Sequence, residues 1–179
     1  MAVIRTFLLV CFALLVSACT GVPKGIEPVK GLNVDRYLGT WYEIARLDHS
    51  FEDGLSRVSA EYELQDDGSI KVTNRGYDAE AGDWSVADGR AVFVDGPDTG
   101  HLKVSFFGPF YSSYIVFGLD EAGYEYAYVT GYNRDYLWFL SRTPDVSAEA
   151  LANFRERARA EGFNLDQLIL VDQSPVPGQ

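Results

Sequence analysis

Short runs in which apolar and polar residues alternate follow one another along most of this chain. In the clearest example Leu102, Val104 and Phe106 alternate with Lys103 and Ser105, which predicts a β-strand with one buried face. Eight such runs can be recognised, over residues 39–47, 58–64, 69–77, 83–94, 101–107, 113–119, 124–132 and 135–141. The segments between them are mostly short and rich in Gly, Asp, Asn and Pro, so consecutive runs are expected to pair as antiparallel hairpins.

The eight predicted strands favour one closed barrel, because closure leaves no sheet edge exposed. Eight is also the number of strands at which a barrel interior is either filled by side chains or holds one small ligand. A β-sandwich is the alternative arrangement of the same strands.

A helix over residues 148–161 is predicted after the last of these strands. Ser147 can cap its start and Gly162 can end it. A final apolar run over residues 168–171 is a candidate edge strand. The apolar residues of the helix form one stripe, which should pack on the outside of the sheet: Leu151, Phe154 and Ala158.

The chain begins with the pattern of an export signal. Arg5 precedes an apolar run over residues 7–16, which is shorter than the roughly 20 residues that a membrane-spanning helix needs. Small residues follow and lead to Cys19, and this pattern resembles the lipobox of bacterial lipoproteins. The resemblance implies cleavage before Cys19 and acylation of that cysteine. The alternative is a plain secretory signal in which the cysteine is incidental.

The resemblance to lipoproteins also predicts the cellular location of the protein and the segments into which the chain is divided. Thr20 follows the cysteine, in place of the aspartate that usually keeps such lipoproteins at the inner membrane. This favours the outer membrane, with a lipid-anchored protein that faces the periplasm. We therefore expect a signal peptide (residues 1–18), a lipidated tether (19–30), a barrel domain (31–171) and a loose tail (172–179).

Composition narrows the range of partners. The chain has 26 acidic and 15 basic residues and a formal net charge of -11, so it should repel nucleic acid and anionic headgroups at long range. Attachment to a membrane would therefore depend on the acyl chains at Cys19. The other cysteine, Cys11, leaves with the signal peptide, so the mature domain would have no thiol for a disulfide, a zinc site or nucleophilic catalysis.

Two segments resemble signature motifs of the lipocalin family. The first motif corresponds to residues 33–35 (Asn-Val-Asp) and 37–45 (Tyr-Leu-Gly-Thr-Trp-Tyr-Glu-Ile-Ala), and the third to residues 140–142 (Leu-Ser-Arg). At the second motif, residues 118–120, only the aspartate matches. Residues 106–110 (Phe-Phe-Gly-Pro-Phe) and 135–144 (Asp-Tyr-Leu-Trp-Phe-Leu-Ser-Arg-Thr-Pro) resemble those of the bacterial outer-membrane lipocalins, lipoproteins related to apolipoprotein D. The resemblance implies an all-β fold, an eight-stranded antiparallel up-and-down barrel with one C-terminal α-helix packed outside.

The same resemblance gives Trp41 and Arg142 a structural role. In lipocalins the tryptophan of the first motif closes one end of the barrel, and the arginine of the third motif packs across it. A guanidinium over an indole ring contributes about 0.5–2 kcal/mol as a cation–π contact. We expect this pair to be a plug and not a ligand site.

Strand parity relative to Arg142 then assigns side chains to the barrel interior. Small and aromatic residues are mixed among them, which predicts an apolar pocket suited to a lipid tail. The alternative is an interior that side chains fill completely. The residues expected to contact a ligand are Ala60, Tyr62, Val72, Asn74, Val104, Phe106, Tyr114, Val116, Ala127, Val129, Trp138 and Leu140.

The loop over residues 48–55 is longer than a hairpin needs and corresponds to the lid of the barrel in lipocalins. Phe51 and Leu55 could touch a ligand there, although a solvated loop with one tucked aromatic ring would fit equally well. The acidic pairs at residues 52–53 and 66–67 lie in turn-like stretches and are expected to be solvated.

Enzymatic function is disfavoured. His49 and His101 do not have the spacing of metal ligands, and the sequence contains neither a Gly-x-Ser-x-Gly elbow nor a glycine-rich phosphate loop. We assign no catalytic residue, metal or cofactor.

These features favour a membrane-anchored protein that binds a fatty acid, phospholipid or lysophospholipid, for lipid storage, transport or envelope maintenance. Two alternatives remain, a carrier of another apolar ligand such as a tetrapyrrole, and an enzyme that acts on lipid. The family resemblance also admits a homodimer, although no self-complementary patch can be identified in the sequence.

Overall fold

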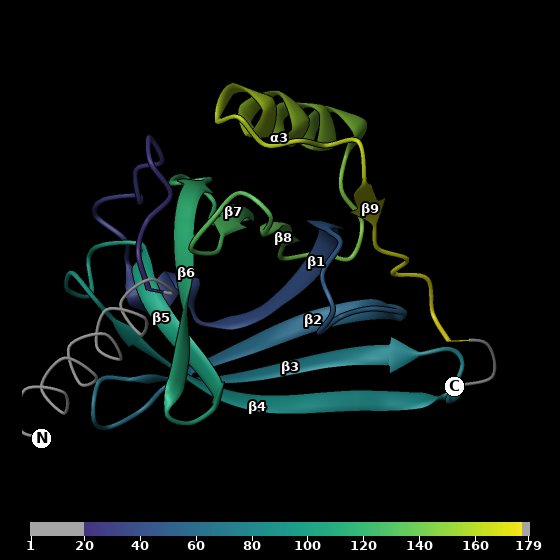
Figure 1. Cartoon of the computed structure of the whole chain (residues 1–179), viewed down its shortest axis with the longest axis horizontal. Helices are drawn as coiled ribbons and strands as arrows, with labels where there is room; N and C mark the ends of the chain where they lie inside the picture. The colour runs from purple at the N-terminus through teal and green to yellow at the C-terminus, as the bar shows by residue number, and fades with distance from the viewer. Residues whose placement is uncertain (1–19, 177–179) are drawn as a thin grey trace, which may run out of the picture.

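The computed structural model describes residues 20–176, so Cys19 and the signal segment lie outside the described residues. Within these described residues, nine strands form one sheet, accompanied by two helices (Figure 1). In chain order the elements are α2 (Val34–Tyr37), β1 (Gly39–Leu47), β2 (Leu55–Leu64), β3 (Ile70–Asp78), β4 (Asp83–Phe93), β5 (His101–Phe107), β6 (Phe110–Leu119), β7 (Tyr126–Thr130), β8 (Leu137–Ser141), α3 (Ala148–Ala160) and β9 (Leu168–Leu170).

The sheet closes into an up-and-down barrel of eight antiparallel strands. Consecutive strands pair from β2 to β8, and β1 joins β8 on one side and β2 on the other. The early part of β1 pairs with β2, as in Trp41↔Ala60, and the later part pairs with β8, as in Arg46↔Trp138. The predicted eight-stranded barrel with a C-terminal helix is thereby confirmed, and the ninth strand pairs with the end of β1.

An irregularity in β1 changes which side chains point inward. The register with β8 shifts between Glu43 and Ala45, as at a β-bulge, where an extra residue alters the alternation. Ile44 and Ala45 consequently belong to the core outside the barrel, whereas Glu43 lines the interior cavity. Simple alternation from Trp41 does not anticipate this shift.

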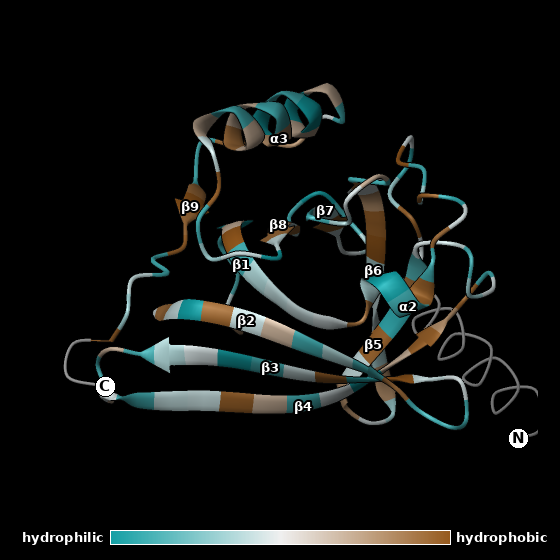
Figure 2. Cartoon of the chain, turned by 180° about the vertical axis from the view of Figure 1, so that it is seen from behind, coloured by the Kyte–Doolittle hydropathy of each residue, from teal (hydrophilic) through white to brown (hydrophobic). Residues whose placement is uncertain are grey.

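Apolar side chains form two cores, one inside the barrel and one between the barrel and α3. Ser147 caps α3 by accepting a hydrogen bond from the Ala150 N–H at 3.1 Å. Phe154 of α3 stacks on Phe139 of β8, with ring centroids 4.8 Å apart, and both rings are fully buried. Figure 2 shows hydrophilic and hydrophobic residues alternating around α3, as expected of an amphipathic helix that covers one side of a barrel.

The segment expected to be a tether instead packs along the barrel. Ile26 is buried in the outer core, with 5% of its surface exposed. The Val29 N–H donates to the Val116 carbonyl at 2.9 Å, and the Gly100 N–H donates to the Val29 carbonyl at the same distance. Single apolar residues among Gly and Pro give no periodic signal, so the contacts of residues 20–30 could not be recognised from the pattern.

The predicted loose tail is also held in place as far as it is described. Gln173 donates from its side-chain amide to the Glu43 carbonyl at 2.7 Å and to the Val58 carbonyl at 2.9 Å. The Arg57 N–H donates to the Asp172 carbonyl at 2.7 Å. These contacts of the tail are made by polar groups, which hydrophobic patterning does not detect.

Candidate functional site

The barrel encloses a cavity of about 640 Å³, within the range of small-molecule sites. Both residues of the expected lid, Phe51 and Leu55, contribute to its wall. Most of the residues expected to contact a ligand also line it: Ala60, Tyr62, Val72, Asn74, Val104, Phe106, Tyr114, Val129, Trp138 and Leu140.

Val116 and Ala127 were expected at the cavity wall, but the structure places them elsewhere. Both are fully buried in the same inner core as Trp41, and neither lines the cavity. Strand parity gives the direction in which a side chain points but not its depth along the barrel, so it could not separate packed positions from lining positions.

Small residues on β4 leave part of the interior open. Ala87 and Ala91 line the cavity where larger side chains would fill it. Gly89 lies between them, and a Cβ atom there would come within 2.8 Å of the Phe106 ring. The missing side chain therefore lets Phe106 lie directly against β4.

Trp41 and Arg142, the pair expected to close one end of the barrel, pack against each other. The guanidinium carbon of Arg142 lies 3.9 Å from the centroid of the Trp41 ring. The guanidinium also donates to the carbonyls of Arg36 at 2.6 Å, Thr40 at 2.8 Å and Tyr124 at 3.3 Å. Trp41 is fully buried, so these residues are engaged with protein groups.

Three tyrosine hydroxyls meet inside the barrel. The Tyr114 hydroxyl lies 2.8 Å from that of Tyr37 and 2.9 Å from that of Tyr62. Burial raises the pKa of all three side chains, so the hydroxyls remain protonated at neutral pH. These hydroxyls form one polar group of the cavity wall, in which each hydroxyl is hydrogen-bonded to another.

A second polar group, which we call the charged cluster, consists of Glu43, Arg46, His49 and Glu52. Arg46 donates to Glu43 Oε1 at 2.8 Å, and its Nε lies 3.9 Å from Glu52 Oε2. His49 Nε2 is 3.1 Å from Glu52 Oε2. Only 12% of the Glu52 side chain is exposed, which corrects the expectation of a solvated side chain at this position, whereas its neighbour Asp53 is exposed as expected.

The pKa values of the two carboxyl groups in the charged cluster are shifted in opposite directions. Burial, together with repulsion from Glu52, raises the pKa of Glu43 well above its ordinary range, although Arg46 opposes this. Burial also acts to raise the pKa of Glu52, but contacts with His49, Glu43 and Trp138 outweigh it and lower the pKa. Glu43 therefore takes up a proton more readily than Glu52 does.

The lid loop is fastened to the barrel through this cluster. Arg46 donates to the carbonyls of Glu52 at 2.7 Å and Leu55 at 3.2 Å. The Trp138 indole donates to Glu52 Oε2 at 3.3 Å. Phe51 stacks on Tyr136 with centroids 5.9 Å apart, and it remains 62% exposed.

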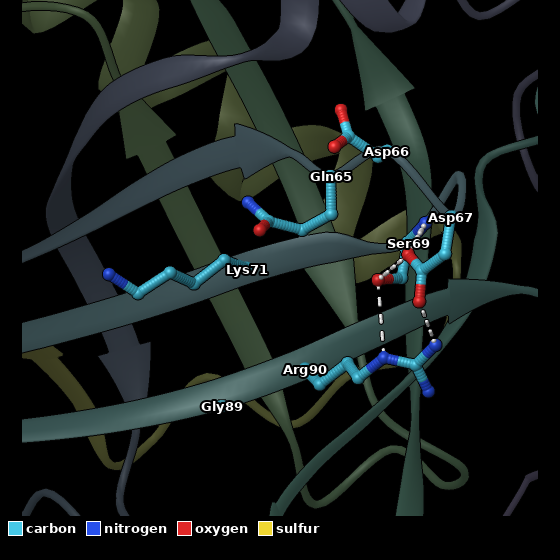
Figure 3. Close-up of a pocket in the computed structure, with 7 residues that line it drawn as sticks. All are labelled: Gln65, Asp66, Asp67, Ser69, Lys71, Gly89 and Arg90. Carbon is cyan, nitrogen blue, oxygen red and sulfur yellow. Dashed lines mark hydrogen bonds and ion pairs between the residues drawn. The ribbon is translucent and has the colours of Figure 1, made fainter.

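A second depression lies outside the barrel at the turn between β2 and β3 (Figure 3). Its polar groups bind one another: Asp67 accepts from the Ser69 hydroxyl at 2.6 Å and from Arg90 at 2.8 Å. The hydrogen bonds from Ser69 and then Arg90 lower the pKa of Asp67 to about 2. These contacts fasten the turn, and the barrel cavity is the stronger candidate for a ligand site.

The described residues were also considered for a metal site and for a membrane-spanning helix. Within residues 20–176, no group of three or more His, Cys, Asp or Glu side chains is placed to hold a metal ion. No helix in the same range is long and apolar enough to cross a membrane.

The chain is similar to known proteins over almost all of its length. Residues 32–173 match a family described as a lipocalin-like domain. The outer membrane lipoprotein Blc of Vibrio cholerae is 53% identical over 167 residues, which is 93% of this chain and 97% of that relative. The protein of the same name from Escherichia coli K12 is 48% identical, over 90% of this chain and 92% of the relative.

Solved structures show the same architecture. The allergen Per a 4 from cockroaches superposes with a TM-score of 0.67 at 25% identity, covering 87% of this chain and 96% of that one. Insecticyanin from the tobacco hornworm Manduca sexta superposes with a TM-score of 0.65 at 19% identity, covering 86% and 87%.

Proposed function

The chain belongs to the lipocalin family, and on that basis we propose that it is a membrane-anchored lipid-binding protein. It holds a fatty acid or a phospholipid or lysophospholipid in the barrel, for lipid storage, transport or envelope maintenance. The observation that carries the proposal is the cavity of about 640 Å³, whose wall is mainly apolar. Members of the family carry apolar ligands, and we assign no catalytic step to this chain.

The energetics of chain burial support this ligand class. Each buried methylene contributes about 0.8 kcal/mol, so roughly fifteen methylenes supply up to about 12 kcal/mol before the cost of ordering the chain is subtracted. Micromolar or tighter affinity is therefore consistent with a single acyl chain in the barrel.

Membrane attachment is proposed from the sequence and from the relatives together. The lipobox-like segment ends at Cys19, and the relatives from Vibrio cholerae and Escherichia coli are named outer membrane lipoproteins. We propose the same location for this chain, with acyl chains on Cys19 and the barrel facing the periplasm.

Tryptophan fluorescence can test the occupancy of the barrel. Trp138 lines the cavity, so a saturating long-chain fatty acid or lysophospholipid should change its emission. Trp138→Phe should remove this change, whereas Trp84→Phe should preserve it. Unchanged emission together with no co-purifying lipid would contradict the proposal, and a visible absorption band on protein from its native host would favour a pigment instead.

A further inference from the structure

The cavity reaches solvent at one end of the barrel and buried tyrosines at the other. Phe51 of the lid loop and Phe107 and Phe110, at the turn between β5 and β6, line the cavity and are mostly exposed. Tyr37 and Tyr62 line the same cavity and are only 3% and 7% exposed. An acyl chain that enters from the exposed rim therefore carries its far end towards the tyrosines.

The tyrosine rings are held in place by stacking and by the neighbouring indole. Tyr37 belongs to α2, and its ring centroid lies 5.0 Å from that of Trp41, whose indole donates to the Tyr37 carbonyl at 2.8 Å. Tyr62 of β2 stacks on Tyr37 with centroids 5.8 Å apart. Tyr114 of β6 meets Tyr62 edge-on, with centroids 6.1 Å apart. The three hydroxyls are thus brought together from three separate elements.

The three hydroxyls carry one proton more than they can use among themselves. Each tyrosine hydroxyl has one O–H donor. Two hydrogen bonds join the group, from Tyr114 to Tyr37 at 2.8 Å and to Tyr62 at 2.9 Å, and these hydroxyls have no further hydrogen-bond partner among residues 20–176. Two bonds use two of the three protons, whichever hydroxyl donates. One O–H of the group therefore always lacks an acceptor.

A buried donor without an acceptor is costly, so this proton calls for an oxygen in the cavity. Burial raises the pKa of all three hydroxyls, so the extra proton is not lost by ionisation at neutral pH. The acceptor must come from whatever occupies the cavity.

A neutral oxygen suits this donor better than a carboxylate does. A carboxylate has two acceptor oxygens, and one spare O–H replaces little of the hydration that a buried anion loses. Burial raises the pKa of Tyr62, and repulsion from Glu52 and Glu43 adds to the shift, although Tyr114 and Arg142 oppose it. The ionised end of a lipid is therefore better placed at the exposed rim, where water solvates it.

We propose that the hydroxyls of Tyr37, Tyr62 and Tyr114 form a subsite for a neutral oxygen near the methyl end of an acyl chain, such as a ketone, hydroxyl or epoxide oxygen. The proposal rests on the proposed function, because it takes an acyl chain in the barrel as given. The spare O–H donates to the ligand oxygen at the buried end of the cavity. The barrel thereby selects chains that are oxygenated far from the carboxyl group over unmodified chains.

Two isomers that differ only in the position of one ketone test the subsite. The full-length acylated protein in nanodiscs is titrated calorimetrically with 15-oxohexadecanoate, 4-oxohexadecanoate and hexadecanoate, each below its micellar concentration. Empty nanodiscs supply the correction for partitioning. The 15-oxo isomer should bind at least about threefold more tightly than the 4-oxo isomer, as expected for the net gain of one hydrogen bond. A smaller ratio of the two affinities would overturn the subsite.

A triple variant removes the spare proton together with its partners. It carries Tyr37→Phe, Tyr62→Phe and Tyr114→Phe. The ratio of the two affinities should fall to about one, because phenylalanine keeps the rings but leaves no donor and no unpaired hydroxyl. A single replacement would not suffice, since the two remaining hydroxyls still hold a spare proton. An unchanged ratio in the triple variant would contradict the proposal.

The matched control removes three hydroxyls outside the cavity. Tyr42, Tyr126 and Tyr128 pack against the outer core and do not line the cavity. Replacing these three by phenylalanine should preserve the ratio of the two affinities. Loss of the ratio in the control would show that it does not depend on the inner hydroxyls.

A second readout uses the unmodified protein and does not depend on the folding of a variant. With isotope-labelled Cζ carbons, the resonances of Tyr37, Tyr62 and Tyr114 should differ between the complexes with the two isomers, because only the 15-oxo ketone accepts from their hydroxyls. Identical resonances in the two complexes would overturn the subsite.

The outcomes distinguish this inference from the function beneath it. If hexadecanoate binds but the isomers bind alike, the subsite fails and lipid binding stands. If none of the three probes binds, the proposed function fails and the subsite fails with it.

Discussion

The guanidinium of Arg142, in the segment after β8, lies over the indole of Trp41, with its central carbon 3.9 Å from the ring centroid. Because Trp41 stands in β1, this contact joins the first and last strands of the barrel. Three carbonyl acceptors fix the orientation of the guanidinium. These contacts support the proposed role of the pair, closure of the barrel at the end away from the lid, and neither residue lines the cavity.

Arg142→Ala should destabilise the barrel by about 2 kcal/mol or more, since it removes a cation–π contact and several charge-assisted hydrogen bonds. Arg142→Lys should recover only part of this loss, because an ammonium cannot reproduce the planar fork. Urea unfolding measures both changes. Stability equal to the unmodified protein in the alanine variant would contradict the role assigned to the pair.

Filling the cavity should remove lipid binding without unfolding the barrel. Ala87 lines the cavity, whereas its neighbour Val86 is 58% exposed on the outside. Ala87→Phe should weaken binding of a sixteen-carbon fatty acid at least tenfold, and Val86→Phe should not. Calorimetric titration of the two variants makes the comparison, and equal affinities would show that the chain binds elsewhere.

The pKa of Glu43 predicts a pH-dependent stability. Because its folded-state pKa is raised, Glu43 contributes stability that is fully present below its ordinary value of about 4.5 and is lost as pH rises through the raised value. Glu43→Gln should therefore gain stability relative to the unmodified protein as pH increases from about 4.5 upward. Denaturant unfolding at a series of pH values measures the difference, and a difference that stays constant would contradict the raised pKa.

Glu52 should show the opposite dependence. Its folded-state pKa is lowered, so its contribution is present above the ordinary value and is lost as pH falls through the lowered one. Glu52→Gln is accordingly expected to be less stable than the unmodified protein at neutral pH, with the gap narrowing in acid. If the difference in stability between the two proteins instead grew as the pH fell, the lowered pKa of Glu52 would be contradicted.

Membrane attachment should depend on the side chain of Cys19. Cys19→Ala should move the protein from the outer-membrane fraction to a soluble fraction while its affinity for lipid stays the same. Cys11→Ala provides the matched control, because that cysteine precedes the expected cleavage site. Membrane retention of the Cys19→Ala variant would require another mode of attachment.

Alternation predicts much of the barrel because one face of each strand is buried. Leu102 and Phe106 are an example: because polar residues alternate with apolar ones between them, the sequence alone indicates a strand and shows which of its faces points inward. The same rule fails at β1, where the bulge after Glu43 changes the parity. One signal was nevertheless present, because Glu43 shares the parity of Trp41 and is thus a charged residue at an inward position.

The sequence predicted which side chains of the candidate site point inward. It did not predict how deep in the barrel each one lies or which polar contacts it makes. Val116 points inward as expected yet belongs to the packed core, since depth depends on how the strands tilt and close. Glu52 was expected in solvent because it lies in a turn-like stretch, and its contacts with Arg46 and Trp138 explain its burial. The contact with Trp138 joins residues far apart in the chain and leaves no local pattern.

The central claim, that the barrel carries a lipid, is tested most directly by mass spectrometry of organic extracts from protein purified from its native host. The account predicts a fatty acid, phospholipid or lysophospholipid in near-stoichiometric amount, and its loss from the Ala87→Phe variant but not from Val86→Phe. An extract free of lipid, or lipid retained equally by both variants, would contradict it.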